Sequence, residues 1–389
     1  MSSSYSTIIG TDTANSIVVS SSSNDSVQAL GGNDTIFGAG GSDIIDLGGG
    51  NDSLALTDNF TAGTVLGGSG NDSIGITSSF AGSVLDGGAD NDTIFVSASP
   101  SAAAIYGGAG TDSLVVTGAL TSATVWGGST TATSTDGADT IYVSGTASAS
   151  QINGNAGNDT VTLAGDLLAG SALVSAATVY GGSTTDTTGD GADSIFISGS
   201  ISKAFVQGNA GADSVVITSS AVSSSLRGGA DNDFISVGSS LSASDVNGNK
   251  GSDTLAFGSI AAATVYGGSA TDTTNDGADS IYVTGSAASA YVQGNAGSDT
   301  LAFGNALSAS TVVGGADGDL ITVTSGITIS SISGGEGSDT IYSNPGSGTL
   351  SQSTVFGGNS SGTSAGNDSI VLGYASLVAS TVYGGAGND

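Results

Sequence analysis

A stretch of about twenty residues recurs along most of this sequence, and it constrains the fold more than any other feature. One copy begins at Ile105, passes through the pair Gly107-Gly108 to Asp112, and continues as Ser113-Leu114-Val115-Val116. The aspartate equivalent to Asp112 returns most often after a further twenty residues. A fixed period of this length is typical of a solenoid, in which each repeat forms one coil.

Three columns of apolar residues keep this register. The first lies two residues before the glycine pair, as at Ile105 and Val125. The second and third follow the aspartate at alternate positions, as at Leu114 and Val116, and the third column is clearly broken at Ser343. Alternating β-branched residues predict strands with one buried face. We expect each coil to contain a strand, a tight Gly-rich turn ending in Asp, a second strand and a looser turn, stacked roughly 4.8 Å apart.

The charge balance of the chain restricts its partners. Lys and Arg total 3, Asp and Glu total 34, and the formal net charge is −31. This balance argues against binding to nucleic acid. Stacked coils would bring the carboxylates close together along one edge, where like charges destabilise a fold. The chain has no His and no Cys, so zinc, thiol and imidazole chemistry are not expected. Oxygen ligands remain, and these favour a hard divalent cation.

Between Gly31 and Leu56 the repeat shortens to nine residues, with the pattern Gly-Gly-x-Asp-x-Ile or Leu. This pattern resembles the calcium-binding nonapeptide of the RTX (repeats-in-toxin, hemolysin-type) family. The resemblance implies an all-β, right-handed parallel β-roll, a β-solenoid that here has about 20 residues per coil, with calcium turns stacked along one edge. It also implies many bound Ca²⁺ ions, for which the motif aspartates are candidate ligands: Asp34, Asp43, Asp52, Asp72, Asp92, Asp112, Asp139, Asp159, Asp193, Asp213, Asp233, Asp253, Asp279, Asp299, Asp319, Asp339, Asp368 and Asp389.

Three turns carry an additional acid, at Asp90, Asp231 and Asp317. These carboxylates either add a calcium ligand or are simply solvated, and both interpretations stay open. We include the three residues among the candidate metal ligands.

The repeat divides the chain into three predicted parts. Residues 1–30 form a degenerate N-terminal cap, residues 31–56 a nonapeptide β-roll, and residues 57–389 a continuous solenoid of 20-residue repeats. In the last part only every second turn keeps the calcium signature, so we expect calcium on one edge there. This version, with its repeated Thr-Val-Tyr-Gly-Gly phrase, is similar to cyanobacterial surface-layer and motility proteins of the oscillin type. Because the sequence stops on Asp389, within a motif, we expect the natural chain to continue, or another molecule to complete the last coil.

Two further features leave their roles open. Four turns are enlarged, at 129–136, 183–190, 269–276 and 359–365, and they are either tolerated surface loops or lateral contacts in an array. Outward residues before the glycine pairs are often aromatic, and they either shield the turn or contact sugars and neighbouring molecules: Tyr106, Trp126, Tyr180, Tyr266, Phe356 and Tyr383.

We predict a structural protein and not an enzyme, because no long segment escapes the repeat to form a distinct catalytic cleft. The expected role is that of an extracellular, calcium-stabilised protein of a surface layer or surface fibril, with a link to motility. Its expected partners are copies of itself and cell-envelope polysaccharide, with no nucleic acid and no membrane span. The first residues lack the features of a signal peptide, and this fits the calcium-dependent secretion route of RTX proteins.

Two alternatives to a surface structural protein stay open. One is an RTX calcium-binding accessory domain of a secreted enzyme, toxin or adhesin. The other is an adhesin or ice-binding solenoid, which requires a regular Thr ladder. The candidate Thr column is interrupted: Thr64, Ser83, Ala104, Thr124, Gln151, Thr178 and Phe205.

Overall fold

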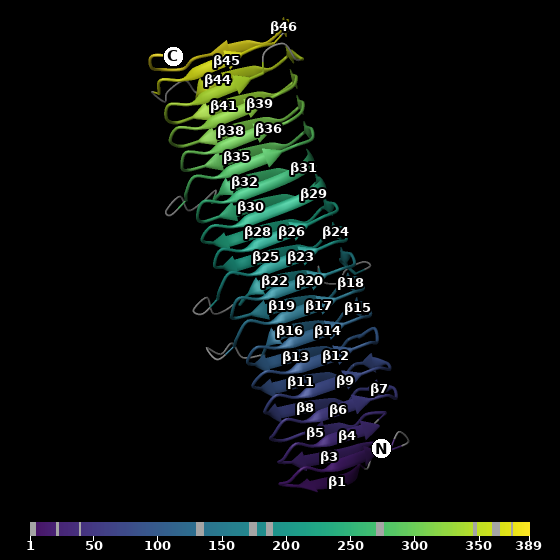
Figure 1. The fold of residues 1–389 in the computed structure, drawn as a ribbon. Coiled ribbons are helices and arrows are strands. Elements are labelled where there is room, and N and C mark those ends of the chain that lie inside the picture. Colours follow the sequence, from purple (N-terminus) through teal and green to yellow (C-terminus); the bar gives the residue numbers. More distant parts are fainter. Residues whose placement is uncertain are drawn as a thin grey trace. The chain divides into compact units, whose positions relative to one another are not determined.

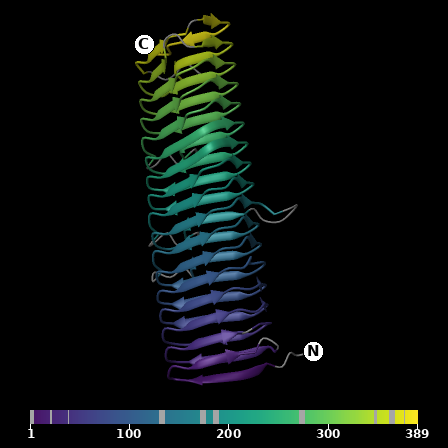
Figure 2. The same ribbon diagram turned by 45° about the vertical axis from the view of Figure 1, so that its right-hand side comes forward.

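The chain folds into parallel β-strands stacked coil upon coil in a computed structural model, which describes residues 5–20, 23–38, 40–129, 136–170, 177–183, 190–269, 276–344, 348–359, 366–374 and 376–389. Two compact units, Met1–Gly199 and Ser200–Asp389, are distinguished by their contacts. Among the described residues, no helix is long and apolar enough to cross a membrane. The all-β parallel solenoid is therefore confirmed within each unit (Figures 1 and 2).

Each coil of the first unit contributes one strand to each of two sheets. Strands of the A sheet lead into the glycine turn and strands of the B sheet follow the motif aspartate. All described pairings are parallel. The A sheet contains β1 (Ser6–Thr11), β3 (Asp25–Leu30), β5 (Ile44–Asp46), β8 (Thr64–Ser69), β11 (Val84–Ala89), β13 (Ala104–Ala109), β16 (Thr124–Gly128), β19 (Gln151–Asn155) and β22 (Thr178–Gly182). The B sheet contains β2 (Ser16–Val19), β4 (Thr35–Gly38), β6 (Ser53–Leu56), β9 (Ser73–Ile76), β12 (Thr93–Val96), β14 (Ser113–Val116), β17 (Thr140–Val143), β20 (Thr160–Leu163) and β23 (Ser194–Ile197). Short strands at the opposite turn are β7 (Phe60–Thr61), β10 (Phe80–Ala81), β15 (Leu120–Thr121), β18 (Ala147–Ser148) and β21 (Leu167–Leu168).

The second unit repeats this plan. Its A sheet contains β25 (Phe205–Ala210), β28 (Ser225–Ala230), β30 (Asp245–Asn249), β32 (Thr264–Gly268), β35 (Tyr291–Asn295), β38 (Thr311–Gly315), β41 (Ser331–Gly335), β44 (Thr354–Gly358) and β47 (Thr381–Tyr383). Its B sheet contains β26 (Ser214–Ile217), β29 (Phe234–Ser242), β31 (Thr254–Ala261), β33 (Ser280–Val283), β36 (Thr300–Phe303), β39 (Leu320–Val323), β42 (Thr340–Ser343) and β45 (Ser369–Leu372). The short strands are β24 (Ile201–Ser202), β27 (Ala221–Val222), β34 (Ala287–Ala288), β37 (Leu307–Ser308), β40 (Ile327–Thr328), β43 (Thr349–Ser351) and β46 (Ser376–Val378).

The register step between coils changes near the N-terminus. Ser26 pairs with Ile44, whereas Ile44 pairs with Thr64. The coil therefore lengthens by two residues once the nonapeptide repeat has ended. The predicted boundaries after residues 30 and 56 stay predictions.

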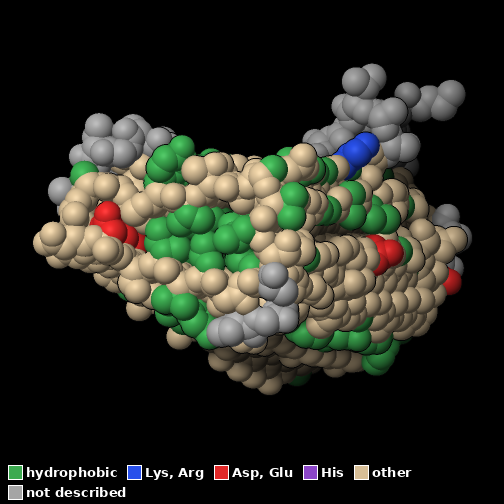
Figure 3. Space-filling model, turned by 90° about the horizontal axis from the view of Figure 1, so that it is seen from above, with side chains coloured by type: hydrophobic (Ala, Val, Ile, Leu, Met, Phe, Trp, Pro, Cys, Tyr) green, Lys and Arg blue, Asp and Glu red, His purple; other side chains and the backbone are tan. Residues whose placement is uncertain are grey.

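The core consists of the predicted apolar columns and one more. Val65, Ile74 and Ile76 are fully or almost fully buried, as are their equivalents in other coils. At the break in the third column, the Ser343 hydroxyl is buried and accepts a 3.0 Å hydrogen bond from the Gly373 N–H. A fourth buried column, missed in the sequence, lies at the opposite turn: Phe60, Phe80, Leu120, Ala147, Leu167, Ile201, Ala221, Leu241, Ile260, Ala287, Leu307, Ile327 and Leu350. Figure 3 shows hydrophobic side chains gathered inside the end of the second unit.

The opposite turn uses left-handed backbone mostly at residues other than glycine. Ala102, Ser122 and Ile329 have φ between 47° and 51°, and Gly82 holds the equivalent position in one coil with φ of 60°. Such φ values cost free energy for any residue with a Cβ, and most for a β-branched one. The sequence therefore carried no recurring glycine signal at this turn.

The structure corrects one detail of the proposed Thr column. Thr64 pairs with Val84, not with Ser83, and the Ser83 side chain is buried. The column is interrupted in either register. The interiors of the enlarged turns lie outside the described residues.

Candidate metal centre

The motif aspartates are joined by a hydrogen bond from each coil to the next. The Asp92 N–H donates to Oδ1 of Asp112 at 2.6 Å, and in the second unit the Asp233 N–H donates to Oδ1 of Asp253 at 2.8 Å. We call this row the aspartate ladder. It contains Asp34, Asp52, Asp72, Asp92, Asp112, Asp139, Asp159 and Asp193 in the first unit, and Asp213, Asp233, Asp253, Asp279, Asp299, Asp319, Asp339, Asp368 and Asp389 in the second.

The second oxygen of the ladder carboxylates lacks a hydrogen-bond donor. Within the described part of the chain, the Oδ2 atom is buried and has no partner in Asp34, Asp52, Asp72, Asp92, Asp112, Asp139, Asp159, Asp233, Asp253, Asp279, Asp299, Asp319, Asp339 and Asp368. Buried polar atoms without a partner are rare, because desolvation without a hydrogen bond is costly. A repeated orphan oxygen of this kind indicates that something else occupies its partner position.

A glycine makes room for this oxygen. A Cβ on Gly107 would overlap both Oδ2 of Asp112 and the carbonyl oxygen of Gly127 in the next coil. A Cβ on Gly248 would overlap Oδ2 of Asp253 and the carbonyl oxygen of Gly267 in the same way. Two oxygens and no donor thus face the same space. Carboxylate and carbonyl oxygens are the ligands that calcium prefers.

Burial of the ladder raises the pKa of its carboxyl groups. Desolvation, followed by the charges of neighbouring aspartates, raises the pKa of Asp139 and of Asp279 to about 9 and that of Asp92 to about 8. Desolvation also raises the pKa of Asp253 to about 7. The metal-free edge therefore resists carrying its full negative charge at neutral pH. The three Lys and Arg residues of the chain are too few to compensate a row of this length.

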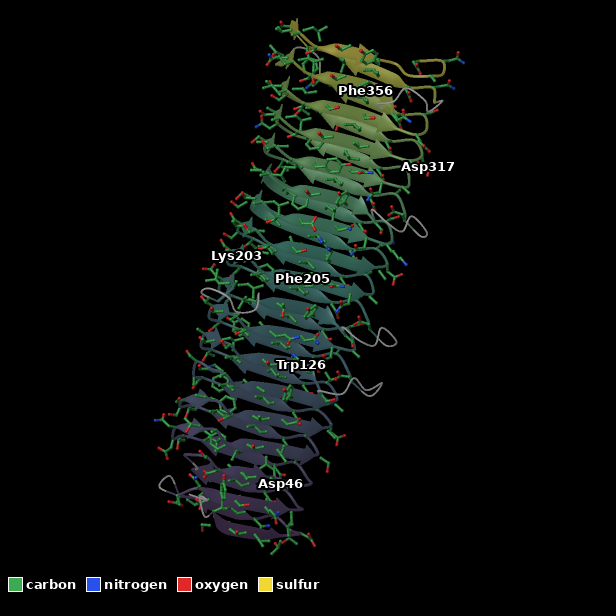
Figure 4. All side chains as sticks on the ribbon, turned by 180° about the vertical axis from the view of Figure 1, so that it is seen from behind. Asp46, Trp126, Lys203, Phe205, Asp317 and Phe356 are labelled. Carbon is green, nitrogen blue, oxygen red and sulfur yellow. The ribbon has the colours of Figure 1, made fainter. Side chains whose placement is uncertain are left out.

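The additional acids occupy the outer side of the turn. Asp90, Asp231 and Asp317 are exposed and have φ between 72° and 75°, where equivalent turns have glycine. Figure 4 shows Asp317 at the rim of its turn. The charge of Asp90 contributes to the raised pKa of Asp72 and Asp92. Their role as ligands stays a prediction.

The opposite edge begins with aspartate and continues with serine. The Asp25 N–H donates to Oδ1 of Asp43 at 2.8 Å, and Oδ2 of Asp43 is buried without a partner. In later coils a serine hydroxyl accepts the equivalent bond, as from the Ala290 N–H to Ser310 at 3.1 Å and from the Ser310 N–H to Ser330 at 3.1 Å. We call this row the serine ladder. It provides the same backbone bond without a buried charge.

The ligand geometry differs from a cluster of carboxylates. Within the described ranges, no three Asp or Glu side chains come together as a metal site. A calcium ion at these turns would bind one or two carboxylates and complete its shell with backbone carbonyl oxygens.

Comparison with known proteins identifies the repeat. The family model described as the RTX calcium-binding nonapeptide repeat (4 copies) matches residues 19–54, 83–98, 133–166, 223–240 and 329–350. The chain carries RTX calcium-binding repeats. No curated protein matches the chain significantly. Among solved structures, the chain is similar to a hyperactive, Ca²⁺-dependent, β-helical antifreeze protein from an Antarctic bacterium, with 19% identity, a TM-score of 0.49, and coverage of 85% of this chain and 84% of that one.

The described residues fit calcium at the RTX turns. The orphan Oδ2 atoms, the glycine cradles and the all-oxygen donor set agree with a hard cation. When bound, calcium would supply the positive charge that the buried carboxylates lack. The ladder aspartates and Asp43 are the residues that would hold it.

Sequence reasoning missed one buried carboxylate, that of Asp25, and three half-buried ones. Asp25 lies on the opposite edge and is 2% exposed. Asp136, Asp190 and Asp276 close three enlarged turns and fold over the glycines that begin them. The repeated phrase Asp-Gly-Ala-Asp was the available signal, but only its second aspartate was in the repeat register.

Proposed function

We propose that this chain is an extracellular, calcium-stabilised structural protein of the cell surface, forming a surface layer or surface fibril that takes part in motility. The aspartate ladder carries this proposal. Among the described residues, the ladder carboxylates with a buried, unpartnered Oδ2 recur from coil to coil, which suits a repeated metal ligand more than a single general acid. RTX repeats are typical of secreted proteins, and calcium modules that work outside cells bind at about 10⁻⁴–10⁻³ M.

The outward face of the A sheet supports contacts with sugars and with copies of the chain. The Tyr106 and Trp126 rings pack edge to face with centroids 5.6 Å apart, and the Phe356 and Tyr383 rings stack at 5.2 Å. In the second unit, an open groove of about 390 Å³ crosses β35, β38 and β41, and it is lined by Gln293, Thr311, Ser331, Ser333 and Glu336 among others. Aromatic rings next to polar side chains suit a polysaccharide. Envelope polysaccharide and a second copy of the chain are therefore the proposed partners.

Electron microscopy of the purified chain tests the structural role. After removal of calcium with a chelator, calcium is restored to one sample and magnesium to a second. We expect sheets or fibrils in calcium and none in magnesium, because magnesium sheds its water reluctantly and demands a stricter geometry.

Monodisperse particles in calcium would contradict the surface-layer role. They would favour the accessory-domain function, in which RTX repeats belong to a secreted enzyme, toxin or adhesin. The RTX family match supports that second candidate equally well.

Binding to envelope polysaccharide is tested separately by co-sedimentation. Tyr266 and Tyr291 lie 5.8 Å apart between ring centroids on the outward face. We expect the double variant Tyr266→Ser/Tyr291→Ser to bind polysaccharide less well than the unmodified chain. Equal binding by both would remove these rings from the contact.

A further inference from the structure

Three enlarged turns end in a second, half-buried aspartate that does not belong to the ladder. Each closes with Asp-Gly-Ala-Asp, of which the last residue is the ladder aspartate. We call Asp136, Asp190 and Asp276 the closing aspartates. A Cβ on the second glycine of the turn would overlap the closing carboxylate, at Gly128, Gly182 and Gly268 respectively. The closing side chain therefore folds back over the start of its own turn.

The carboxylates of Asp136 and Asp276 are hydrogen-bonded through one oxygen. Oδ2 of Asp276 accepts a 3.1 Å hydrogen bond from the Ala296 N–H in the next coil, and the Gly277 N–H also donates to this carboxylate. Asp136 has the equivalent partners: the Ala156 N–H donates to its Oδ2 at 3.5 Å, and the Gly137 N–H also donates to this carboxylate. In both residues Oδ1 is buried and has no partner among the described residues. Asp136 and Asp276 thus repeat the half-satisfied pattern of the ladder.

The ladder aspartate of the same turn presents a second orphan oxygen. Asp139 and Asp279 are each 1% exposed, and their Oδ2 atoms have no partner in the described part of the chain. The closing charge acts on the ladder residue three positions later in both turns. Each of these two coils therefore brings together a buried ladder carboxylate and a half-buried closing carboxylate, each with one buried oxygen that lacks a partner, whereas an ordinary coil has one such carboxylate.

An asparagine in the following coil accompanies each closing aspartate. Asn155, Asn209 and Asn295 replace the second glycine of the pair in the coil that follows, while the fourth enlarged turn has Ala365 in the closing position and is followed by Gly385. The Asn295 amide donates to the Gly268 carbonyl at 2.5 Å, and the Asn155 amide donates to the Ser129 carbonyl at 3.4 Å. The asparagine thus fixes the start of the turn over which the closing carboxylate folds.

Charge distinguishes these turns from the others. A divalent ion at an ordinary turn needs carboxylates from two successive coils to balance its charge, whereas a closing and a ladder aspartate balance it within one coil. Calcium affinity rises with the charge of the ligand set. We propose that Asp136 with Asp139, Asp190 with Asp193, and Asp276 with Asp279 form a distinct class of divalent-cation site that binds calcium more tightly than the other turns. This inference rests on calcium binding at the RTX turns.

Equilibrium dialysis of the full chain against graded free calcium tests the proposal. Bound calcium is counted by mass spectrometry, and circular dichroism monitors β-structure at each step. We expect three ions per chain to be retained at free calcium on the order of tenfold below that needed to fill the remaining turns. The triple variant Asp136→Asn/Asp190→Asn/Asp276→Asn should lose this early step and keep the later one. The control variant Asp12→Asn/Asp46→Asn/Asp58→Asn has the same net charge as this triple variant and should keep both steps.

Trp126 gives a local readout that does not depend on counting. It is the single Trp of the chain, it directly precedes Gly127-Gly128, and it lies on the outward face beside the first enlarged turn (Figure 4). Terbium emission excited through Trp126 should rise with the first equivalents of added Tb³⁺. The single variant Asp136→Asn should lower this early emission, and Asp276→Asn should leave it unchanged.

The outcomes distinguish a failure of the proposed closing-aspartate sites from a failure of calcium binding by the whole chain. If the unmodified chain binds calcium but the triple variant retains the same number of ions at every calcium concentration, the closing aspartates are not ligands and the proposal is overturned alone. If the unmodified chain binds no calcium at all, the proposed calcium-stabilised function is overturned as well. If the triple variant does not fold, the terbium signal of Asp136→Asn decides: undiminished emission would overturn the proposal.

Discussion

The Asp92 N–H donates a 2.6 Å hydrogen bond to Oδ1 of Asp112, while Oδ2 of Asp112 is buried without a partner. One carboxylate oxygen thus serves the backbone of the preceding coil and the other is left for a cation. The fold and the metal site share the same side chain. A change that removes the ladder charge and keeps the hydrogen-bond acceptor should therefore affect stability with opposite signs in the presence and absence of calcium.

Removal of calcium should unfold much of the β-structure. The metal-free ladder places buried carboxylates in successive coils, and each filled site adds stability by mass action. Far-UV circular dichroism should show loss of β-structure in excess chelator and its return at millimolar calcium. A spectrum that is unchanged by chelator would contradict this dependence.

The metal-free chain should be more stable in acid than at neutral pH. The folded-state pKa reaches about 8 in Asp92 and about 9 in Asp279, mainly through desolvation, against 3.8 for an ordinary Asp. A raised pKa means that the folded chain holds more protons than the unfolded chain, so this stability is present near pH 4 and is lost as the pH rises to about 9. Thermal melting in chelator at pH 5 and pH 8 measures the trend. In saturating calcium the trend should reverse, because calcium competes with protons for the carboxylates.

Two substitutions at Asp253 separate its two oxygens. Asp253→Asn keeps an acceptor for the Asp233 N–H but removes the charge, so we expect higher stability in chelator and lower calcium affinity. Asp253→Ala removes the acceptor as well, and an unsatisfied buried N–H costs about 1–3 kcal/mol with or without calcium. Denaturant unfolding in both conditions makes the comparison. Equal behaviour of the two variants would show that the bond from Asp233 contributes nothing.

The serine ladder should stabilise the fold without calcium dependence. Ser310 accepts from the Ala290 N–H and donates to the Ser308 carbonyl at 2.9 Å. Ser310→Ala should therefore lower the free energy of unfolding by about 1–3 kcal/mol. Denaturant unfolding should give the same decrease in calcium and in chelator. The reverse change Ala263→Ser supplies an acceptor in the same row and should stabilise the chain. A calcium-dependent effect of Ser310→Ala would mean that this edge also binds ions.

Ile329→Gly should stabilise the chain. Ile329 is 58% exposed and has φ of 51°, a conformation that disfavours β-branched side chains. Relief of about 1–2 kcal/mol of steric strain exceeds the entropic penalty of Gly of roughly 0.5–1 kcal/mol. The melting temperature should rise, whereas Thr328→Gly in strand β40 should lower it. A lower melting temperature for Ile329→Gly would show that its side chain makes a contact that outweighs the strain.

The periodic parts of the fold could be predicted because they depend on local patterns. The alternating pattern around Val65 and Ile74 predicts that these side chains are buried, and the glycine pair at Gly107 predicts a tight turn. The fourth core column could not be read so easily, because Phe60, Ala147 and Ile260 share only a position and differ in size. The left-handed residues of the opposite turn were hidden for a similar reason, since Ala102 and Ile329 do not favour positive φ.

The row of candidate ligands could be predicted, but the different roles of the two oxygens of each carboxylate could not. No sequence pattern says that Oδ1 of Asp112 belongs to the backbone and Oδ2 does not. The closing aspartates were overlooked because Asp136 and Asp276 fall outside the repeat register, and their role depends on how an enlarged turn folds back. The asparagines that follow those turns gained an explanation only from contacts between coils.

The uniform direction of the hydrogen bonds in the aspartate ladder affects how the gene for a repeat protein of this kind can change in length. Within each unit, a described interior coil takes one acceptor from the coil after it and supplies one to the coil before it, as Asp92, Asp112 and Asp139 do in succession. Duplication or deletion of a whole coil leaves the number of unmet N–H groups unchanged. Unequal recombination between the repeated DNA segments can therefore lengthen or shorten the protein in whole coils without creating a badly bonded junction.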